Sequence, residues 1–160
     1  MDFKTEMAER TAQIEQIIKK YLPKEEGYQK TIMEAMNYSV LAGGKRLRPM
    51  LMQETYRLFG GRSEVIEPFM AAIEMIHTYS LIHDDLPGMD DDTMRRGRPT
   101  NHVVFGVGQA ILAGDGLLNF AFETMLGCAL RHPERAKAFL AAIDEVARGC
   151  GVTGMIAGQV

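Results

Sequence analysis

The stretch from Asp84 to Arg98 concentrates charged side chains whose types suit metal and phosphate chemistry. Five of the chain's eight aspartates lie between Asp84 and Asp92, and three arginines follow within six residues. Clustered carboxylates are the hard oxygen ligands that Mg2+ prefers, and guanidinium groups match the geometry of phosphate oxygens. We therefore expect a site here that binds a metal ion together with a phosphate group.

Three interpretations of the aspartates compete. A solvated acidic loop is the commonest outcome for a run of like charges. An EF-hand calcium loop does not fit, because its alternating acidic positions, central glycine and terminal glutamate are missing. A Mg2+ bridge to a substrate diphosphate fits best, since magnesium usually takes one or two carboxylates together with phosphate oxygens. The apolar segment before the aspartates and the arginines after them favour this third interpretation.

A second cationic segment, Gly43-Gly44-Lys45-Arg46-Leu47-Arg48-Pro49, precedes a predicted helix. Lys45 and Arg48, with the backbone N–H groups at the start of that helix, would form an anion pocket. The segment is not a P-loop, because no strand precedes it and no Ser or Thr follows the lysine. Taken alone, a solvated basic turn explains the pattern equally well.

Two further polar residues interrupt apolar helices. His77 lies seven residues before Asp84, which is two helical turns and places both residues on one face. A lone histidine on such a helix is more often a satisfied core residue, but a phosphate or metal nearby would change that assignment. Asp115 lies in a second apolar helix, where an unpaired carboxylate would be costly. It should either be paired within the fold or face the polar cavity, and we favour pairing, with an arginine of the 95–98 group as the candidate partner.

The elements that must position these residues are helices. Apolar residues repeat at helical spacing along the whole chain, and no alternating strand pattern appears, so we predict one all-α domain over residues 1–160. The segment from Ser63 to Asp84 is apolar nearly all round, which is typical of a central helix. The predicted helices run from Met7 to Pro23, Ile32 to a Gly43-Gly44 C-cap, Pro49 to Phe59, Ser63 to Asp84, Phe105 to Leu130, Pro133 to Gly149, and from Gly151 onward.

Composition narrows the function classes. The chain of 160 residues is 46% hydrophobic and 24% charged, as expected of a soluble globular domain. Its net charge of −3 and lack of a basic block argue against nucleic acid as a partner. Cys128 and Cys150 show no zinc or CxxC spacing and are expected to be reduced thiols. No signal peptide and no uncharged run of about 18 residues is present, so we expect a cytoplasmic protein without a membrane span.

Five blocks of the sequence resemble, in the same order, the trans-type isoprenyl diphosphate synthases, and most closely the bacterial farnesyl diphosphate synthases (geranyltranstransferases). The blocks are GGKRLRP at 43–49, EMIHTYSLIHDDLPGMD at 74–90, RRGRPTNH at 95–102, AGDGLL at 113–118 and GMIAGQ at 154–159. The resemblance implies an antiparallel helix bundle around a central cavity. It also implies a Mg2+-dependent prenyltransferase that condenses isopentenyl diphosphate with dimethylallyl or geranyl diphosphate to give farnesyl diphosphate.

The resemblance assigns one group of residues to isopentenyl diphosphate. Carried over by position, Lys45, Arg48 and His77 would hold the diphosphate of this substrate, and Arg96 would contact it as well. These residues include the basic segment and the histidine singled out above, so the resemblance favours an anion pocket over a solvated turn.

A second group would handle the allylic diphosphate. Asp84 and Asp90 would bind Mg2+, Asp85 would support them, and Arg95 would contact the allylic diphosphate. The implied chemistry agrees with the residue types: magnesium makes the diphosphate a leaving group, the isopentenyl double bond attacks the allylic carbon, and a proton is then lost.

Product length is set in this family by side chains just below the first aspartate motif. Ser80 lies one turn below Asp84, and Tyr79 lies about 7.5 Å below it along the helix axis. A tyrosine at this position resembles the pattern of enzymes that make farnesyl diphosphate, in which its bulk blocks further growth of the chain.

The family's pattern should continue past Gln159-Val160 to a second aspartate-rich motif, which this sequence lacks. We therefore expect the chain to be the N-terminal portion of such an enzyme, with an incomplete bundle and no activity alone. The apolar faces of 105–130 and 151–160 should then need a partner, and the resemblance implies a homodimer. A non-catalytic helical fragment that binds diphosphate and Mg2+, or a synthase of geranylgeranyl or longer products, remain alternatives.

Overall fold

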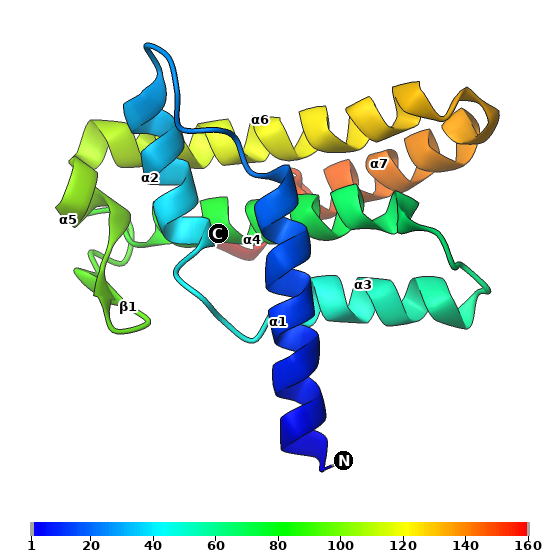
Figure 1. Ribbon diagram of the computed structural model, residues 1–160. Coiled ribbons are helices and arrows are strands. Elements are labelled where there is room, and N and C mark those ends of the chain that lie inside the picture. The colour runs from blue at the N-terminus through cyan, green and yellow to red at the C-terminus, as the bar shows by residue number, and fades with distance from the viewer. Residues whose placement is uncertain (1, 160) are drawn as a thin grey trace.

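The computed structural model describes residues 2–159, and helices make up most of that range (Figure 1). The α-helices are α1 (Phe3–Tyr21), α2 (Lys30–Val40), α3 (Leu47–Leu58), α4 (Glu67–Asp84), α5 (Asn101–Phe105), α6 (Val107–Arg131) and α7 (Ala136–Cys150). Short 3-10 helices are η1 (Glu64–Ile66), η2 (Pro133–Arg135) and η3 (Ala157–Gln159). The predicted all-α class is confirmed.

Helix α4 is the central element, as its sequence predicts. Eleven of its eighteen residues are buried, because α6 packs along it and α1 and α3 contact other sides. In Figure 1, α6 runs antiparallel to α4, and α7 returns beside α6 in the direction of α4. Fully buried alanines and methionines, such as Ala71 and Met75 on α4 and Ala113 on α6, fill this contact. Small side chains allow the two helices to approach closely.

A glycine allows the closest approach of α6 to α4. A Cβ atom at Gly114 would lie 2.1 Å from Nε2 of His83, far inside van der Waals contact. The imidazole of His83 therefore fits against α6 only because residue 114 lacks a side chain. Nε2 of His83 lies 3.0 Å from the carbonyl oxygen of Ile111, which fixes the ring at the end of α4.

Two predicted boundaries at the basic segment were wrong. Helix α2 ends at Val40 with Leu41 as its C-cap, so the glycines do not cap it. Helix α3 begins at Leu47, with Arg46 as N-cap in the left-handed conformation, and Pro49 is its third residue. A proline is tolerated throughout a first turn, where no N–H donor is needed, so it does not mark the start uniquely.

The region between α4 and α6 also differs from the prediction. Residues Met94–Arg95 (β1) and Arg98–Pro99 (β2) form a small antiparallel hairpin, which we call the arginine hairpin. Arg96 and Gly97 at its turn both have positive φ, 54° and 74°, as tight hairpin turns require. Gly106, with φ of 87°, then separates α5 from α6. The single helix predicted from Phe105 therefore begins at Val107.

The last described segment is not the helix expected from Gly151. Residues 151–159 form turns that end in η3, while Val160 lies outside the described residues. The segment folds back on the end of α7, and the N–H of Met155 donates to the carbonyl of Gly149 at 2.9 Å. A Cβ at Gly154 would lie 2.1 Å from that same carbonyl oxygen, so this turn depends on glycine.

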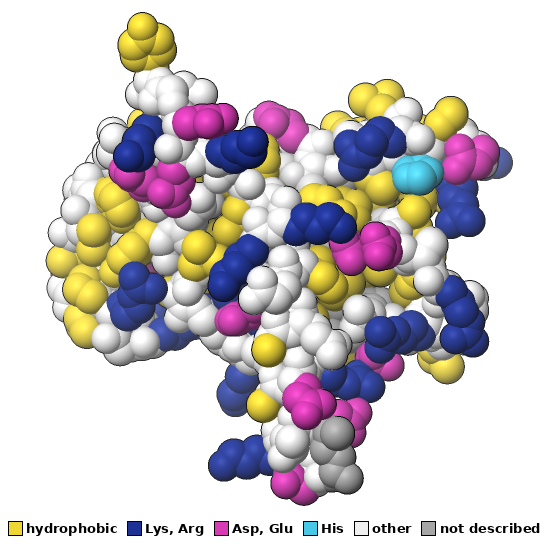
Figure 2. Space-filling view, viewed as in Figure 1, with side chains coloured by type: hydrophobic (Ala, Val, Ile, Leu, Met, Phe, Trp, Pro, Cys, Tyr) yellow, Lys and Arg dark blue, Asp and Glu magenta, His cyan; other side chains and the backbone are white. Residues whose placement is uncertain are grey.

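Exposed apolar side chains gather on α5 and along α6. Figure 2 shows hydrophobic side chains clustered over the end of the molecule where α5 lies, while charged side chains of both signs alternate over α1. Exposed members of the apolar group include Val104, Val107, Ile111, Leu112 and Leu130. The predicted exposure of an apolar face on this helix is confirmed.

One segment, Glu64–Asp84, is long and apolar enough by composition to cross a membrane. However, 61% of its most apolar window is buried inside the protein. Burial of this kind is typical of the core helix of a soluble protein, so the segment is weak evidence for a membrane span.

Candidate functional site

The C-terminal end of α4 carries the aspartates, and we call residues Asp84–Asp92 the aspartate loop. Asp84 is the last residue of α4 and Asp85 is its C-cap. The N–H of Asp90 donates to the carbonyl of Asp84 at 2.8 Å, so the loop folds back over the helix end. Asp91 has φ of 55°, the left-handed conformation that this tight return requires.

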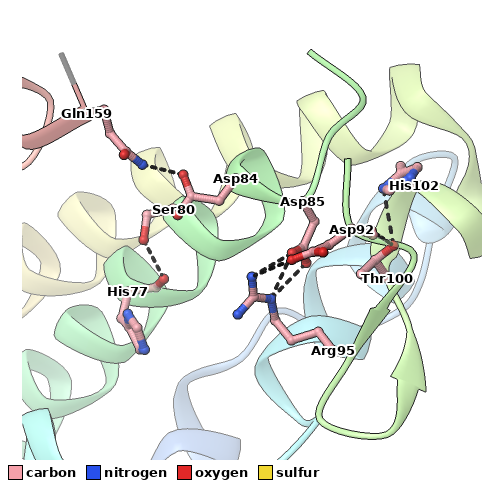
Figure 3. A network of polar contacts seen from close by, with 9 residues as sticks. All are labelled: His77, Ser80, Asp84, Asp85, Asp92, Arg95, Thr100, His102 and Gln159. Atoms are coloured by element: carbon pink, nitrogen blue, oxygen red, sulfur yellow. Dashed lines mark hydrogen bonds and ion pairs between the residues drawn. The ribbon is translucent and has the colours of Figure 1, made fainter. Parts of the chain in front are cut away.

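Asp85 is turned inward and is only 3% exposed. The guanidinium of Arg95 grips its carboxylate: Nε lies 2.8 Å from Oδ1 and 3.0 Å from Oδ2, and Nη2 lies 2.7 Å from Oδ1. Figure 3 shows this fork, with the carboxylate of Asp92 beside that of Asp85. Asp85 therefore anchors the arginine hairpin to the end of α4, and the fork fixes the direction of Arg95.

Asp84 faces a different environment. Burial raises the pKa of its carboxyl, and the neighbouring carboxylate of Asp90 raises that pKa further. The side-chain amide of Gln159 donates to Oδ1 of Asp84, which brings the end of the described chain over the aspartate loop (Figure 3). A cation would relieve the repulsion between these carboxylates.

The carboxylates of the aspartate loop suit magnesium if a substrate supplies further oxygen ligands. Residues 2–159 contain no group of three His, Cys, Asp or Glu side chains arranged to hold a metal ion. Magnesium, however, is usually held by one or two carboxylates together with substrate phosphate oxygens and water. Asp84 and Asp90 would supply that smaller set. The carboxylate of Asp85 is already engaged by Arg95 and does not join it.

A basic pocket opens two turns further down α4. We use this name for a cavity of about 470 Å³ whose lining includes Lys45, Arg48, His77 and Arg96. The sequence-predicted ligands of isopentenyl diphosphate thus lie together, although they come from three separate segments. Lys45 and Arg48 are exposed to solvent, as groups that meet a ligand must be.

His77 joins the basic pocket to α4. Burial lowers the pKa of its imidazole, and the nearby Arg48 guanidinium lowers that pKa further. The ring is therefore neutral at pH 7, when one nitrogen can donate a hydrogen bond and the other can accept one. The hydroxyl of Ser80 donates to the backbone carbonyl of His77 at 2.9 Å (Figure 3).

Arg46 lies between Lys45 and Arg48 in the basic segment, but the structure turns its side chain inward. Its side chain is 1% exposed, and its Nη1 lies 2.7 Å from Oε1 of Glu74 on α4. Its Nη2 donates to the carbonyl of Val40 at 2.8 Å. Arg46 and Glu74 were missed as functional candidates because neither their spacing nor their types indicate that they pair.

Arg96 closes the pocket from the arginine hairpin. Its Nη1 donates to the carbonyl of Gly43. A Cβ atom at Gly44 would lie 2.9 Å from that same Nη1, and Gly44 has φ of 136°. Residue 44 must therefore be a glycine for two reasons: its φ is unfavourable for other residues, and a side chain there would prevent the Arg96 guanidinium from covering the loop.

The arginine hairpin is also clamped to α2. The hydroxyl of Tyr38 donates to the carbonyl of Pro99 at 2.9 Å, and the Arg98 guanidinium lies 4.4 Å from the centre of the Tyr38 ring. The hydroxyl of Thr100 donates to the carbonyl of Asp92 at 2.8 Å (Figure 3). The contacts of Tyr38 join segments that lie 61 residues apart in the chain, so no sequence signal identified them.

Tyr79, the predicted length-determining residue, is 8% exposed. Its ring packs edge-on against the imidazole of His83, with 5.8 Å between ring centres. Burial raises the pKa of its hydroxyl, and the thiol of Cys150 on α7 adds to the shift. Between α4 and α7 lies a cavity of about 380 Å³ lined mainly by apolar residues, and it shares Arg48 and His77 with the basic pocket.

The predicted partner of Asp115 was wrong. Its side chain is 62% exposed, and Oδ1 lies 3.8 Å from Nε2 of His83 rather than against an arginine. The reason is that α6 buries only one face: Ala113, Gly114 and Leu117 point inward and Asp115 points outward. An exposed carboxylate bears little desolvation cost and needs no charged partner.

The chain matches known proteins along most of its length. A family model described as "Polyprenyl synthetase" matches residues 29–155. The farnesyl diphosphate synthase of Geobacillus stearothermophilus is 49% identical over 152 residues, which cover 94% of this chain and 50% of that protein. The heterodimeric geranylgeranyl pyrophosphate synthase large subunit 1 of Arabidopsis thaliana is 51% identical over 129 residues, which cover 81% of this chain and 35% of that protein.

Solved structures show the same arrangement of helices. An FPP/GFPP synthase from Zymomonas mobilis matches with a TM-score of 0.87 and 39% identity, over 98% of this chain and 55% of that one. A geranyltransferase from Legionella pneumophila matches with a TM-score of 0.86 and 35% identity, over 98% and 54%. The chain spans about half or less of the length of these relatives.

Proposed function

The chain belongs to the polyprenyl synthetase family, and we propose that it carries the isopentenyl diphosphate pocket and the first magnesium-binding motif of a prenyltransferase. The reaction would join isopentenyl diphosphate to an allylic diphosphate. One observation carries the proposal: the basic pocket and the aspartate loop lie along the same face of α4, with His77 and Asp84 seven residues apart.

The spacing suits two diphosphate substrates. Seven residues of α-helix rise by about 10.5 Å, so two anionic groups bound at His77 and near Asp84 would be close without overlapping. The cations of the basic pocket would neutralise one diphosphate directly. The other diphosphate would meet carboxylates, which repel it unless a metal ion intervenes. The resemblance to the family implies that isopentenyl diphosphate takes the pocket and the allylic diphosphate the aspartate loop, where the metal ion would activate it as a leaving group.

The chain's own residues then have distinct tasks. Lys45, Arg48 and Arg96 would hold isopentenyl diphosphate, with His77 adding a hydrogen bond. Asp84 and Asp90 would hold Mg2+, which when bound neutralises the allylic diphosphate and so improves it as a leaving group.

On the allylic side, Asp85 holds Arg95 so that its guanidinium can contact the diphosphate. The bond between allylic C1 and oxygen breaks, with its electron pair leaving on diphosphate, and the isopentenyl double bond forms the new carbon–carbon bond. A proton is then lost to the released diphosphate. Fixed charges that stabilise the departing anion would supply most of the rate enhancement.

We propose farnesyl diphosphate as the product, because the buried ring of Tyr79 lies just below the aspartate loop, where bulk stops chain growth. A geranylgeranyl product is the second candidate, since several relatives at about this identity are named geranylgeranyl pyrophosphate synthases. We further propose a cytoplasmic homodimer, because α6 exposes apolar residues such as Ile111 and Leu112 that a second copy would cover.

Two measurements test the proposal in order. Calorimetric titration with isopentenyl diphosphate tests the basic pocket, and a Lys45→Met/Arg48→Met variant should lose this binding while a surface variant, Lys24→Met, keeps it. Condensation of radiolabelled isopentenyl diphosphate with geranyl or dimethylallyl diphosphate, followed by chromatography of the products, tests turnover and length.

The outcomes separate the candidates. In an enzyme that also carries the second aspartate-rich motif, binding and a C15 product are the expected result, whereas a C20 product favours the geranylgeranyl alternative. Binding without condensation, by protein whose intact mass matches the 160 residues, would show a non-catalytic diphosphate-binding chain. Absence of binding by the wild-type protein would refute the proposal.

A further inference from the structure

Arg46 differs from the other cations of the basic segment in having no access to solvent. Its side chain is 1% exposed, and the carboxylate of Glu74, 2.7 Å away, is itself 3% exposed. A second carboxylate, Glu15 of α1, lies 3.5 Å from Nη2. Arg46 and Glu74 contribute to the wall of the basic pocket, but their charged groups are buried and bind each other, so the charge of Arg46 is compensated inside the protein.

The guanidinium instead joins three segments that together form the pocket. Its Nη2 holds the end of α2 through Val40, and its Nη1 holds α4 through Glu74. Its backbone is the N-cap of α3, with φ of 50° and ψ of 34°. Glu74 lies one turn before His77 on α4, so the ion pair fixes the loop that carries Lys45 and Arg48 against the turn that carries His77.

Arg96, the fourth cationic or histidine side chain of the basic pocket, is held in place by the same loop. Arg96 donates to Gly43 and covers Gly44, two residues before Arg46. A shift of the loop would therefore move Arg96 as well as Lys45 and Arg48. Asp84 and Asp90 are held separately, by the end of α4 and by their own backbone hydrogen bond, and the Arg95 fork is anchored on Asp85.

From these contacts we propose that Arg46, paired with Glu74, is the positioning residue of the basic pocket. It sets the geometry in which Lys45, Arg48, His77 and Arg96 meet one diphosphate, and it leaves the aspartate loop unaffected. The inference rests on the proposed function of that pocket, and it predicts that loss of the pair weakens isopentenyl diphosphate binding selectively.

A double variant, Arg46→Asn/Glu74→Gln, tests this without leaving a buried charge unpaired. Asparagine tolerates both the left-handed conformation and the N-cap position, so the backbone preference at residue 46 is kept. We expect the Kd for isopentenyl diphosphate to rise by about 10²-fold, the size of effect that a displacement of about 1 Å can produce. The Kd for geranyl diphosphate with MgCl2 should change by less than about twofold, because distant sites behave independently.

A second variant, Arg46→Lys, separates positioning from charge. Lysine keeps the positive charge but lacks the planar fork that bonds two partners at once. Selective weakening of isopentenyl diphosphate binding by this variant supports positioning. The matched control is Arg10→Gln/Glu54→Gln, which removes a surface ion pair of 2.8 Å between α1 and α3, and neither Kd should change.

The outcomes are distinct. A folded double variant, or Arg46→Lys, that binds isopentenyl diphosphate as tightly as wild type would overturn the inference. Equal weakening of both substrates would also overturn it, because that is the result of general destabilisation. If the double variant does not fold, Arg46→Lys decides between the same results. Wild-type protein without affinity for isopentenyl diphosphate would instead refute the proposed function on which the inference rests.

Discussion

The basic pocket and the aspartate loop lie on one face of α4, yet the protein prepares them differently. In the pocket, like charges are held together by a buried ion pair between Arg46 and Glu74 and by a close contact at Gly44. In the aspartate loop, Asp85 has a fixed counter-charge, whereas burial and Asp90 raise the pKa of Asp84.

The difference indicates which site can bind its ligand unaided. A cationic pocket needs only the anion, and because the loop that carries Lys45 and Arg48 is already held in place, the backbone contributes little ordering cost. A carboxylate pair that repels itself needs a cation before it can accept another anion. We therefore expect isopentenyl diphosphate to bind without magnesium and the allylic diphosphate to require it. Variants of each site, made in an enzyme that also carries the second aspartate-rich motif, test this division.

The largest effect should come from Asp84→Asn, which removes a proposed magnesium ligand while keeping the side-chain shape. We expect turnover to fall by about 10³-fold, which corresponds to about 4 kcal/mol of lost transition-state stabilisation. The Kd for isopentenyl diphosphate should stay unchanged, as measured by titration calorimetry.

Asp91→Asn is the matched control for that variant, because Asp91 is exposed, has φ of 55°, and asparagine accepts that conformation. Turnover of Asp84→Asn within tenfold of wild type, or a parallel loss of isopentenyl diphosphate binding, would contradict the separation of the two sites.

Tyr79→Ala should change the product rather than either binding site. Removal of the buried ring opens space beside the apolar cavity between α4 and α7, so chain growth should continue to C20 or beyond. Chromatography of the products would measure this. Tyr79→Phe keeps the bulk and should still give C15, and an unchanged C15 product from the alanine variant would refute the assignment of Tyr79.

Gly44→Ala should weaken the basic pocket alone. The added Cβ would displace Arg96, and φ of 136° is strained for any residue other than glycine. We therefore expect the KM for isopentenyl diphosphate to rise about tenfold. This change corresponds to a free energy inside the range of about 1–3 kcal/mol that backbone strain of this kind costs. Gly88→Ala in the aspartate loop meets no atom within 4 Å and should leave this KM unchanged. Steady-state kinetics of both variants would show whether the close contact matters.

The smallest effect concerns pH and His77. Burial and Arg48 lower the pKa of His77 in the folded protein, so the unfolded state binds more protons once the pH falls below the ordinary value of about 6.5. Stability contributed by the neutral ring is complete above that pH and is lost as the pH falls toward the folded pKa. The free energy of unfolding, measured by urea titration, should therefore fall between pH 7 and pH 5. In His77→Gln the part of this fall that His77 causes should be absent.

A bound diphosphate would favour the protonated imidazole, so the affinity of the wild-type protein for isopentenyl diphosphate should rise a few-fold over the same acid range. The His77→Gln variant provides the baseline for ionisation of the ligand itself. Identical pH profiles for the two proteins would show that His77 takes no part in binding.

Much of the site could be predicted because it lies within single elements. The relation of His77, Ser80 and Asp84 follows from helical spacing alone, once α4 is recognised as a helix. The central position of α4 likewise follows from a segment with almost no polar face. Local rules of this kind also predicted α1 and α7 close to their observed bounds.

Contacts between distant segments could not be predicted from local patterns. Arg46 and Glu74 lie 28 residues apart, and nothing in their own neighbourhoods distinguishes the buried Arg46 from the exposed Arg48. The sequence predicts a high free-energy cost for an unpaired Asp115 carboxylate within an apolar helix. Only the packing of α6 on α4 shows that Asp115 lies on the face of α6 that meets solvent. The arginine hairpin needs α2 and Asp85 to hold it.

The order of residues along the chain predicted most of the helices, their apolar faces and the residue types available for metal and phosphate. The tertiary structure decided which charges face the ligand and which hold the fold. The physical reason is that helical periodicity depends on neighbours along the chain, whereas the free energy of a charge depends on how much water and which counter-charges surround it. Those surroundings come from residues brought together only when the chain folds.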